Sequence, residues 1–337
     1  SASGIEVELI EKRPEFSIAD GAGVLLPGNA AAMLDVLGHL DAVRAHAREI
    51  PGVQLSSPEG KVLGRVPCDE LSYPTLGMRY SRLRETLLGD MPVSFGVSIE
   101  TLHDDEQTAA GLSDGSMRRY DLVVGADGVH SSVRSLAFGE QPAEVFEQYS
   151  GYRFVIDNDL GFDAATTYLG DGRTLLFVPL PGNQVYCGAG PVHADRKVAA
   201  DTPAETIART YHDFPKAAEA LQACDEDTVF IPSQFWQVDT PLWHKGRTVL
   251  IGDAAHATAP TLSQGAAMAL EDAAVLIAEL KSCENLNEAL ANYQRRRESR
   301  VRFVQAESRR RILANDTTDA KAGRLQRFSS AAFGACL

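Results

Sequence analysis

The 337-residue sequence has no excess of positive charge, since 32 Lys and Arg residues stand against 46 Asp and Glu residues. The formal net charge is -14, which argues against a nucleic-acid partner because no surplus of cations is available to displace counterions from phosphates. Long apolar runs are also lacking. None approaches the roughly 20 residues that cross a bilayer, and the amino terminus has no basic region followed by an apolar core. We therefore expect a soluble protein without a membrane partner.

Cysteine is scarce and irregularly placed. The five cysteines are odd in number, far apart and free of any CxxC spacing: Cys68, Cys187, Cys224, Cys283 and Cys336. This pattern favours reduced thiols over disulfides or a zinc site and predicts a cytoplasmic location. With 44% hydrophobic and 23% charged residues, the chain can bury the core of one large domain or of two closely packed ones.

The glycine fingerprint of a dinucleotide-binding turn is missing as well. "GAGVLLPG" at 21–28 and "GAGPVHA" at 188–194 both lack the third glycine at the required spacing, and we interpret them as ordinary turns. The strand that should follow such a turn is nevertheless there. Apolar and acidic residues alternate over 5–9, and the run stops at Glu11. In doubly wound domains, an acidic residue at the end of the second strand binds a ribose diol.

Two explanations of the missing fingerprint stay open. Either roughly 30 residues of a βα unit are absent through truncation or disorder, or the protein lacks a phosphate-binding turn. The first four residues, "SASG", resemble the last turn of a helix that ends on a glycine, where the missing helix should end. We favour the first explanation.

The rest of the chain alternates between helical and strand patterns. "NAAAMLDVLGHLDAVRAHA" places apolar residues from Met33 to Val43 on one helical face, and "LRETLL" predicts a helix over 83–88. The apolar strand 122–124 ends in "GADG". Short β-rich runs bounded by turns fill about 150–240, and long helices follow residue 265.

These patterns predict an α/β fold: a doubly wound, Rossmann-like domain with an inserted antiparallel sheet and C-terminal helices. We expect three segments. Residues 1–150 belong to the doubly wound domain, which lacks its first strand and glycine-rich turn. Residues 151–240 form a β-rich substrate domain, and residues 241–337 return to the first domain and add helices.

The stretch "TVLIGDAAHATAPTLSQGAAMALEDAA" at 248–274 carries the strongest chemical signal. After a buried strand, Gly252 permits close backbone approach and Asp253 offers an acceptor to a polyol hydroxyl. The helix that starts near Gly265 and Ala266 has free amides that could meet electron-rich oxygens. A ribityl chain and a flavin ring fit this arrangement, and the amides would stabilise negative charge on the reduced ring.

Three segments, "GADGVHSSVR", "WHKGRTVLIGDAAHATAPTLSQGAAMALEDA" and "NYQRRRESR", resemble those of the class A flavoprotein monooxygenases, which include para-hydroxybenzoate, salicylate and urate hydroxylases. The resemblance extends from about residue 4 to about residue 310. It implies that Asp127 and Gly128 lie near the FAD pyrophosphate and the path of the nicotinamide donor. It further implies that Asp253 binds the ribityl chain and that Pro260 lies beside the flavin ring.

Two further assignments follow from this resemblance. Many relatives carry an arginine three residues before the leucine of a helix, and that position relative to Leu83 is Tyr80 here. We assign the role to the neighbouring Arg79. Glu11 and Arg13 complete the set of expected cofactor-binding residues. No catalytic side chain and no metal site are predicted.

The resemblance implies an FAD-dependent monooxygenase in which NAD(P)H reduces FAD and O2 forms a flavin C4a-hydroperoxide. That species would hydroxylate or epoxidise a small planar aromatic or conjugated substrate. The protein is expected to be a monomer or a homodimer. Two alternatives remain: a dehydrogenase or reductase of the same fold, and a flavin-free binding or regulatory protein derived from it.

Several side chains have competing interpretations. Tyr168, Phe177, Tyr186 and Trp236 are candidates for the substrate cavity, although alternating aromatics in a sheet are more often core. We interpret His256 as a structural histidine beside the strand. The arginines from Arg295 to Arg300 are interpreted as a solvated helical face with ion pairs to nearby acids.

Overall fold

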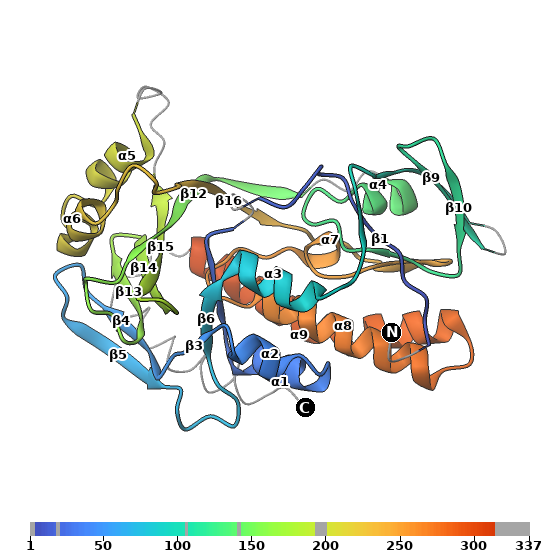
Figure 1. The fold of residues 1–337 in the computed structure, drawn as a ribbon, viewed down its shortest axis with the longest axis horizontal. Coiled ribbons are helices and arrows are strands. Elements are labelled where there is room, and N and C mark those ends of the chain that lie inside the picture. The colour runs from blue at the N-terminus through green and yellow to red at the C-terminus, as the bar shows by residue number, and fades with distance from the viewer. Residues whose placement is uncertain (1–3, 18–20, 105–106, 140–142, 193–200, 314–337) are drawn as a thin grey trace.

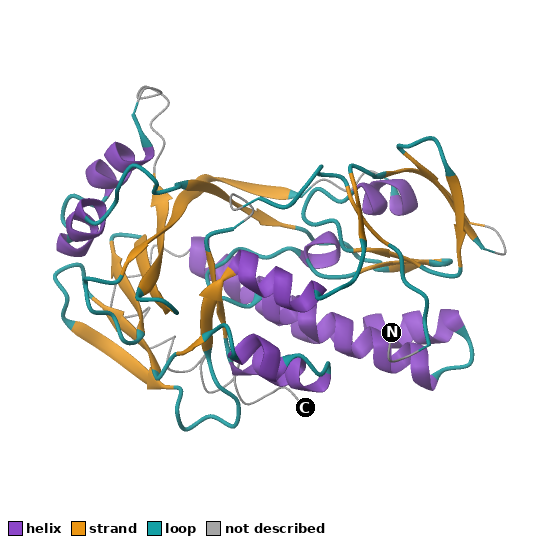
Figure 2. Ribbon diagram, in the orientation of Figure 1, coloured by secondary structure: helices purple, strands orange, loops and turns teal. Residues whose placement is uncertain are grey.

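The structure is a computed structural model that describes residues 4–17, 21–104, 107–139, 143–192 and 201–313. Figure 1 shows a β-rich unit at one end of the molecule and two long helices, α8 (Gly265–Ser282) and α9 (Leu286–Leu313), that run through its middle. Figure 2 shows strands at both ends of these helices. The predicted mixed α/β architecture is confirmed.

The largest sheet has seven strands and forms the β-rich unit. Their order is β16 (Ile231–Gln237), β12 (Glu144–Asp157), β15 (Gln184–Val192), β14 (Arg173–Leu180), β13 (Ala165–Gly170), β4 (Gly52–Ser56) and β5 (Val62–Pro67). All neighbours are antiparallel except β13 and β4. The sequence predicted an antiparallel sheet over 150–240, and the structure adds two strands from residues 52–67.

The two faces of this sheet have different neighbours, because successive side chains of a strand point to opposite sides. On β14, Leu175 and Phe177 pack into a core with residues of α5 (Pro203–Thr210) and α6 (Pro215–Gln222). Leu176 and Val178 belong to a second cluster, which includes Ala22 just before β2 (Gly23–Leu26). We call the side of Leu176 and Val178 the inner face, since it meets the rest of the molecule.

Short sheets make up the remainder of the β structure. β2 pairs with β6 (Leu76–Arg79), which also pairs with β3 (Arg48–Glu49). β1 (Leu9–Glu11) is parallel to β7 (Val93–Phe95), and β11 (Val123–Gly125) is parallel to β18 (Thr248–Leu250), which pairs with β17 (His244–Lys245). β8 (Ile99–Asp104), β9 (Thr108–Leu112) and β10 (Met117–Tyr120) form an antiparallel meander. The parallel pair of β11 and β18 supplies the strand ends of the site.

The predicted helices are present with one difference. α3 (Tyr80–Leu88) and α4 (Ser132–Phe138) follow β6 and the 125–131 loop, and α7 (Asp253–His256) follows β18. The helical pattern over Met33 to Val43 predicted one continuous face, but the structure has two helices, α1 (Gly28–Val36) and α2 (Leu40–Arg44). Gly38 adopts a φ of +78° between them, a conformation that ends a right-handed helix.

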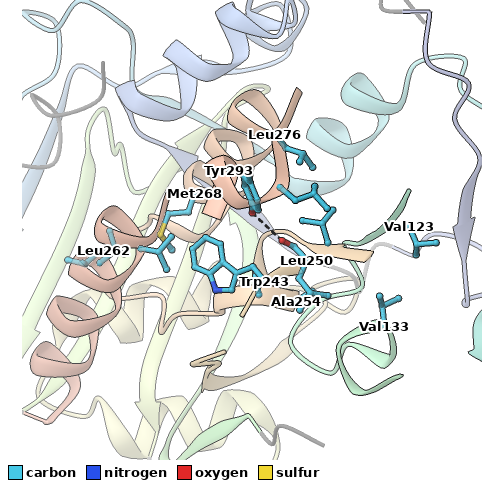
Figure 3. Packing of buried hydrophobic residues seen from close by; sticks show 14 residues of the cluster. Val123, Val133, Trp243, Leu250, Ala254, Leu262, Met268, Leu276 and Tyr293 are labelled. Atoms are coloured by element: carbon cyan, nitrogen blue, oxygen red, sulfur yellow. Dashed lines mark hydrogen bonds between the residues drawn. The ribbon is translucent and has the colours of Figure 1, made fainter. Parts of the chain in front are cut away.

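The core beneath the parallel strands joins β18 to the C-terminal helices. Figure 3 shows Trp243, Leu250, Ala254 and Met268 packed around Tyr293 of α9. The Tyr293 hydroxyl donates a hydrogen bond of 3.1 Å to the carbonyl oxygen of Leu250. This contact fixes α9 against the strand that leads into the 248–274 stretch.

Close packing of β6 on the seven-stranded sheet yields a first prediction. A Cβ atom at Gly77 would lie 2.4 Å from the carbonyl oxygen of Pro179, so the backbones would have to separate. We expect Gly77→Ala to lower the free energy of unfolding by about 1–3 kcal/mol, as overpacking does elsewhere. Gly64→Ala in β5 is the matched control, since a Cβ atom there would have no atom of the described residues within 4 Å. Equal urea midpoints for the two variants would contradict the prediction.

Candidate functional site

Two loops that the sequence singled out lie side by side. β11 and β18 are parallel neighbours, and the amide of Ile251 donates a hydrogen bond of 3.0 Å to the carbonyl oxygen of Gly125. Because parallel strands present their carboxyl ends at the same edge, the 125–128 loop and the turn at Gly252 leave the sheet together. Arg134, which is buried, links them by donating to the carbonyl oxygens of Ala254 (2.7 Å) and Val129 (2.8 Å).

The turn at Gly252 requires glycine for two reasons. Its φ is +56°, in the region that side chains disfavour, and a Cβ atom would lie 3.2 Å from the Cβ of Ala269 in α8. The amide of Gly252 donates a hydrogen bond of 2.8 Å to Oδ2 of the buried Asp272, also in α8. The turn is therefore held directly against the first half of α8.

Asp253 begins α7 with an accessible side chain that protein atoms nevertheless surround closely. Burial raises the pKa of its carboxyl, although the side chain is reached by solvent. We call this carboxylate recessed, because neighbouring atoms partly enclose it while solvent still reaches it. No hydrogen bond or ion pair to another described residue occupies this carboxylate. It is available to accept hydrogen bonds from a ligand hydroxyl.

The amino end of α8 lies open next to this turn. Gln264 is the N-cap residue, and among the residues that the structure describes no side chain caps the helix. A Cβ built at Gly265 meets no described atom within 4 Å, and Ala266 is half-buried. The first amides of an 18-residue helix are thus left for a ligand, with the positive end of the helix dipole behind them.

Asp127 has a structural role in the neighbouring loop. Its carboxylate accepts hydrogen bonds from the hydroxyls of Ser131 and Ser132 and from the amide of Val133 (3.1 Å), at the start of α4. Gly128 has a φ of +80° and no described atom near a built Cβ. Hydrogen bonds hold the loop at Asp127, and the described residues leave space at Gly128, so a ligand could approach the backbone there.

The other expected cofactor residues lie at separate points of the fold. Glu11, at the carboxyl end of β1, accepts bidentate hydrogen bonds of 3.0 Å from Arg13. Arg79 is the residue before α3, is half-buried, and donates 3.1 Å to the side-chain oxygen of Gln184 in β15. Pro260 lies exposed between α7 and α8. The structure brings together the 252–253 turn and α8, whereas Glu11 and Arg13 pair with each other at the end of β1.

A buried polar cluster supports the turn from below. In α8, Asp272 accepts from His256 Nε2 (2.6 Å) and from Arg297 Nε (2.8 Å), in addition to Gly252. Burial opposes the ionisation of Asp272, but the charges and hydrogen bonds of His256 and Arg297 outweigh it and hold its pKa below the ordinary value. Its neighbour Glu271 pairs with Arg297 at 2.6 Å.

The same cluster extends to the open end of α8. Asn29 of α1 donates to Glu271 (2.9 Å) and to the side chain of Gln264 (3.0 Å), which also accepts from Arg300 (2.7 Å). The N-cap residue of α8 is thereby fixed by two other helices. We call Asn29, His256, Gln264, Glu271, Asp272, Arg297 and Arg300 the buried cluster.

These contacts correct the expectation for the arginines of 295–300 and agree with the expectation for His256. Arg297 is 5% exposed and Arg300 points into the buried cluster, so the arginines of 295–300 are not simply a solvated face. Arg297 and Arg300 are three residues apart, so they lie on the same side of α9. This spacing was present in the sequence but was not recognised within the run of arginines. His256, taken as structural from the sequence, is buried against Asp272. Sequence reasoning did not assign roles to Arg134 or Asp272, and it interpreted Arg297 as part of a solvated face with ion pairs.

The four aromatic candidates are divided between the faces of the sheet. Tyr168 and Phe177 are buried in the core beneath α5 and α6, where Phe177 stacks on Phe162. Tyr186 lies on the inner face, and its ring packs where a Cβ at Gly23 would be. Trp236 of β16 meets His130 of the 125–131 loop, with ring centroids 4.6 Å apart. We carry only Tyr186 and Trp236 forward as candidates near a substrate.

The residues at the turn and at α8 fit the flavin end of FAD. An enclosed carboxylate without a hydrogen-bond partner among the described residues suits a ribityl hydroxyl, and uncapped helix amides next to open space at Gly265 suit an electron-rich ring edge.

Within the described residues, no group of His, Cys, Asp and Glu side chains could hold a metal ion. No described helix is long and apolar enough to cross a membrane.

Comparison with known proteins agrees with this fit. A family model described as "FAD binding domain" matches residues 1–308. The 2-heptyl-3-hydroxy-4(1H)-quinolone synthase of Pseudomonas aeruginosa is 31% identical over 325 residues, covering 91% of this chain and 82% of that protein. The 6-hydroxynicotinate 3-monooxygenase of Pseudomonas fluorescens is 29% identical, covering 90% and 84%.

A solved structure shares the fold. Klebsiella pneumoniae HpxO, complexed with FAD and uric acid, superimposes with a TM-score of 0.87 at 22% identity, over 99% of this chain and 90% of that one.

Proposed function

The chain belongs to the FAD-binding-domain family of flavin-dependent monooxygenases, and on this premise we propose that it inserts one oxygen atom into a flat aromatic or conjugated small molecule. NAD(P)H is the proposed reductant and O2 the proposed oxidant. The two named relatives are called after a hydroxylated quinolone and after 6-hydroxynicotinate, both heteroaromatic compounds.

The observation that carries the proposal is the recessed carboxylate of Asp253 beside the uncapped end of α8. We infer that Asp253 accepts hydrogen bonds from the ribityl chain and that the amides at Gly265 and Ala266 stabilise negative charge at the ring edge. FAD, when bound, supplies two-electron transfer and the activation of dioxygen. Gly252 lets the backbone come close, and Pro260 and Gly128 are the further residues that we propose to lie along the cofactor.

The protein's own contribution is position and exclusion of water. The buried cluster fixes both the 252–253 turn and Gln264, so the acceptor and the helix amides hold one geometry. The inner face of the seven-stranded sheet, with Tyr186 and Leu176, is proposed to close the site opposite them. Segment 151–240 is accordingly proposed as the substrate domain, between cofactor-binding segments 1–150 and 241–337. Glu11, Arg13, Arg79 and Asp127 remain proposed cofactor residues.

The test of this function separates oxygenation from simple reduction. Protein loaded with FAD is supplied with NADH or NADPH under 18O2, with a panel of aromatic acids, phenols and quinolones. We expect at least one compound to stimulate nicotinamide oxidation and to gain one 18O atom by mass spectrometry. Product formed equally well without oxygen would instead indicate the reductase alternative.

A further inference from the structure

The buried cluster contains a charge that its own hydrogen bonds do not fully explain. Arg300 of α9 donates a hydrogen bond of 2.7 Å to the side-chain oxygen of Gln264, a neutral group, and lies 3.5 Å from Oε1 of Glu271. Its Nε atom is buried and has no hydrogen-bond partner among the described residues. A largely buried guanidinium that is paired so incompletely is weak support for the fold, because its desolvation is not fully repaid.

Glu271 brings a negative charge to the same point. Its Oε1 accepts a hydrogen bond of 2.9 Å from Asn29, and the same amide nitrogen donates at 3.0 Å to the side-chain oxygen of Gln264. The carboxylate of Glu271 and the guanidinium of Arg300 therefore both adjoin Gln264. Burial opposes the ionisation of Glu271, but the charges of Arg297 and Arg300 outweigh it and hold its pKa below the ordinary value.

Gln264 connects this pair of charges to the open end of α8. It is the N-cap residue, directly before Gly265, and it is buried. The amides that we propose to face the flavin ring begin at the next residue. Because the pair is largely enclosed by protein, water and salt screen its field less than the field of surface charges. Each of the two charges therefore acts on the electrostatic potential at the amino end of α8.

The carboxylates and guanidiniums of the buried cluster balance one another. Asp272 and Glu271 stand against Arg297 and Arg300, and Arg297 contacts both carboxylates. Removing the charge of Arg300 leaves the cluster one charge more negative, whereas neutralising Glu271 leaves it one charge more positive. Substitutions at two adjoining side chains thus change the potential at the helix end in opposite directions.

We propose that Arg300 and Glu271 are positioning residues that set the reduction potential of FAD bound at the amino end of α8, by their charges and through Gln264. This inference rests on the proposed function, in which the helix end meets the negative charge of the reduced ring. Arg300 raises the potential, because its positive charge stabilises the reduced ring more than the neutral oxidised ring. Glu271 opposes this effect and limits it. A higher potential makes electron transfer from the proposed reductant more favourable.

The potential of the bound cofactor tests this inference without turnover. FAD-loaded protein is reduced stepwise in the absence of oxygen and NAD(P)H, in equilibrium with redox dyes of known potential, and the absorbance of FAD is followed. We expect Arg300→Met to weaken the binding of reduced relative to oxidised FAD roughly 3- to 10-fold, which lowers the two-electron potential by about 15–30 mV. Arg300→Lys keeps the charge and should stay within about 2-fold of wild type.

Neutralising the carboxylate should have the opposite effect. Glu271→Gln keeps the shape of the side chain and an oxygen acceptor for Asn29, and it should raise the potential by about 15–30 mV. In the double variant, Arg300→Met with Glu271→Gln, the two shifts should largely cancel. Damage to the packing of α8 would move the potentials of both single variants in the same direction, so opposite signs distinguish a charge effect from a structural one.

Arg302→Met and Glu298→Gln are the matched controls, because they make the same charge changes in an exposed ion pair of the same helix. Water and salt screen that pair, so neither control should shift the potential measurably.

Three results would overturn the inference: equal potentials in wild type and Arg300→Met, equal shifts in Arg300→Met and Arg300→Lys, or shifts of the same sign in Arg300→Met and Glu271→Gln. If Glu271→Gln fails to fold, the contrast between the two Arg300 variants decides the question, since both leave Glu271 its ion pair with Arg297. Wild-type protein that retained no FAD would contradict the proposed function itself. Retained FAD with the same potential in all variants would reject only this role of the two charges.

Discussion

Replacing Asp272 by alanine is expected to lower the free energy of unfolding by about 3–5 kcal/mol, the range measured when one partner of a buried ion pair is removed. Asp272 is fully buried and serves three groups: the amide of Gly252, His256 and Arg297. Without Asp272, Arg297 keeps its ion pair with Glu271, but the amide of Gly252 loses the carboxylate that accepts its hydrogen bond. Urea denaturation followed by circular dichroism measures the change.

The pH dependence provides a second readout for the same variant. The pKa values of Asp272 and Glu271 are held below their ordinary values, so the stability that they contribute is present above the unfolded carboxyl pKa, near 4, and is lost as pH falls through the folded value. The difference between wild type and Asp272→Ala should therefore shrink in acid. Glu298→Ala, which breaks an exposed pair with Arg302, is the control and should change stability by less than about 1 kcal/mol. Similar losses in the two variants would contradict this role of Asp272.

Asp253→Asn is expected to separate cofactor binding from stability. The carboxylate accepts charge-assisted hydrogen bonds in the proposed complex, so its neutralisation should weaken FAD binding roughly 10- to 100-fold. Since burial raises the pKa of this carboxyl, its ionised form is disfavoured in the folded protein without FAD, and the variant's melting temperature should equal or exceed that of wild type. FAD titration and thermal denaturation of the FAD-free protein measure the two effects.

The control for this variant is Asp90→Asn, an exposed position after α3. It should change neither quantity. A lower melting temperature in Asp253→Asn with unaltered FAD affinity would show that the carboxylate serves the fold rather than the cofactor.

The sequence predicted the parts of the site that lie on continuous chain. Gly252, Asp253 and the start of α8 are close in sequence, so strand and helix patterns were enough to place them. The sequence indicated that β11 and β18 each end in small residues and a carboxylate, but it did not predict that the two strands pair in parallel.

The sequence interpretations that were wrong concern residues whose surroundings depend on tertiary contacts. Arg297 and Arg300 look like members of a charge run until α9 packs on α8 and buries them against Glu271. Tyr168 and Phe177 point away from the inner face, and only the strand register decides this.

A crystal structure of the protein with FAD would locate the cofactor itself. We predict the isoalloxazine ring between the amino end of α8 and the inner face of the seven-stranded sheet, with a ribityl hydroxyl within hydrogen-bond distance of Asp253. A flavin ring bound elsewhere, or a ribityl chain without contact to Asp253, would refute the proposed site.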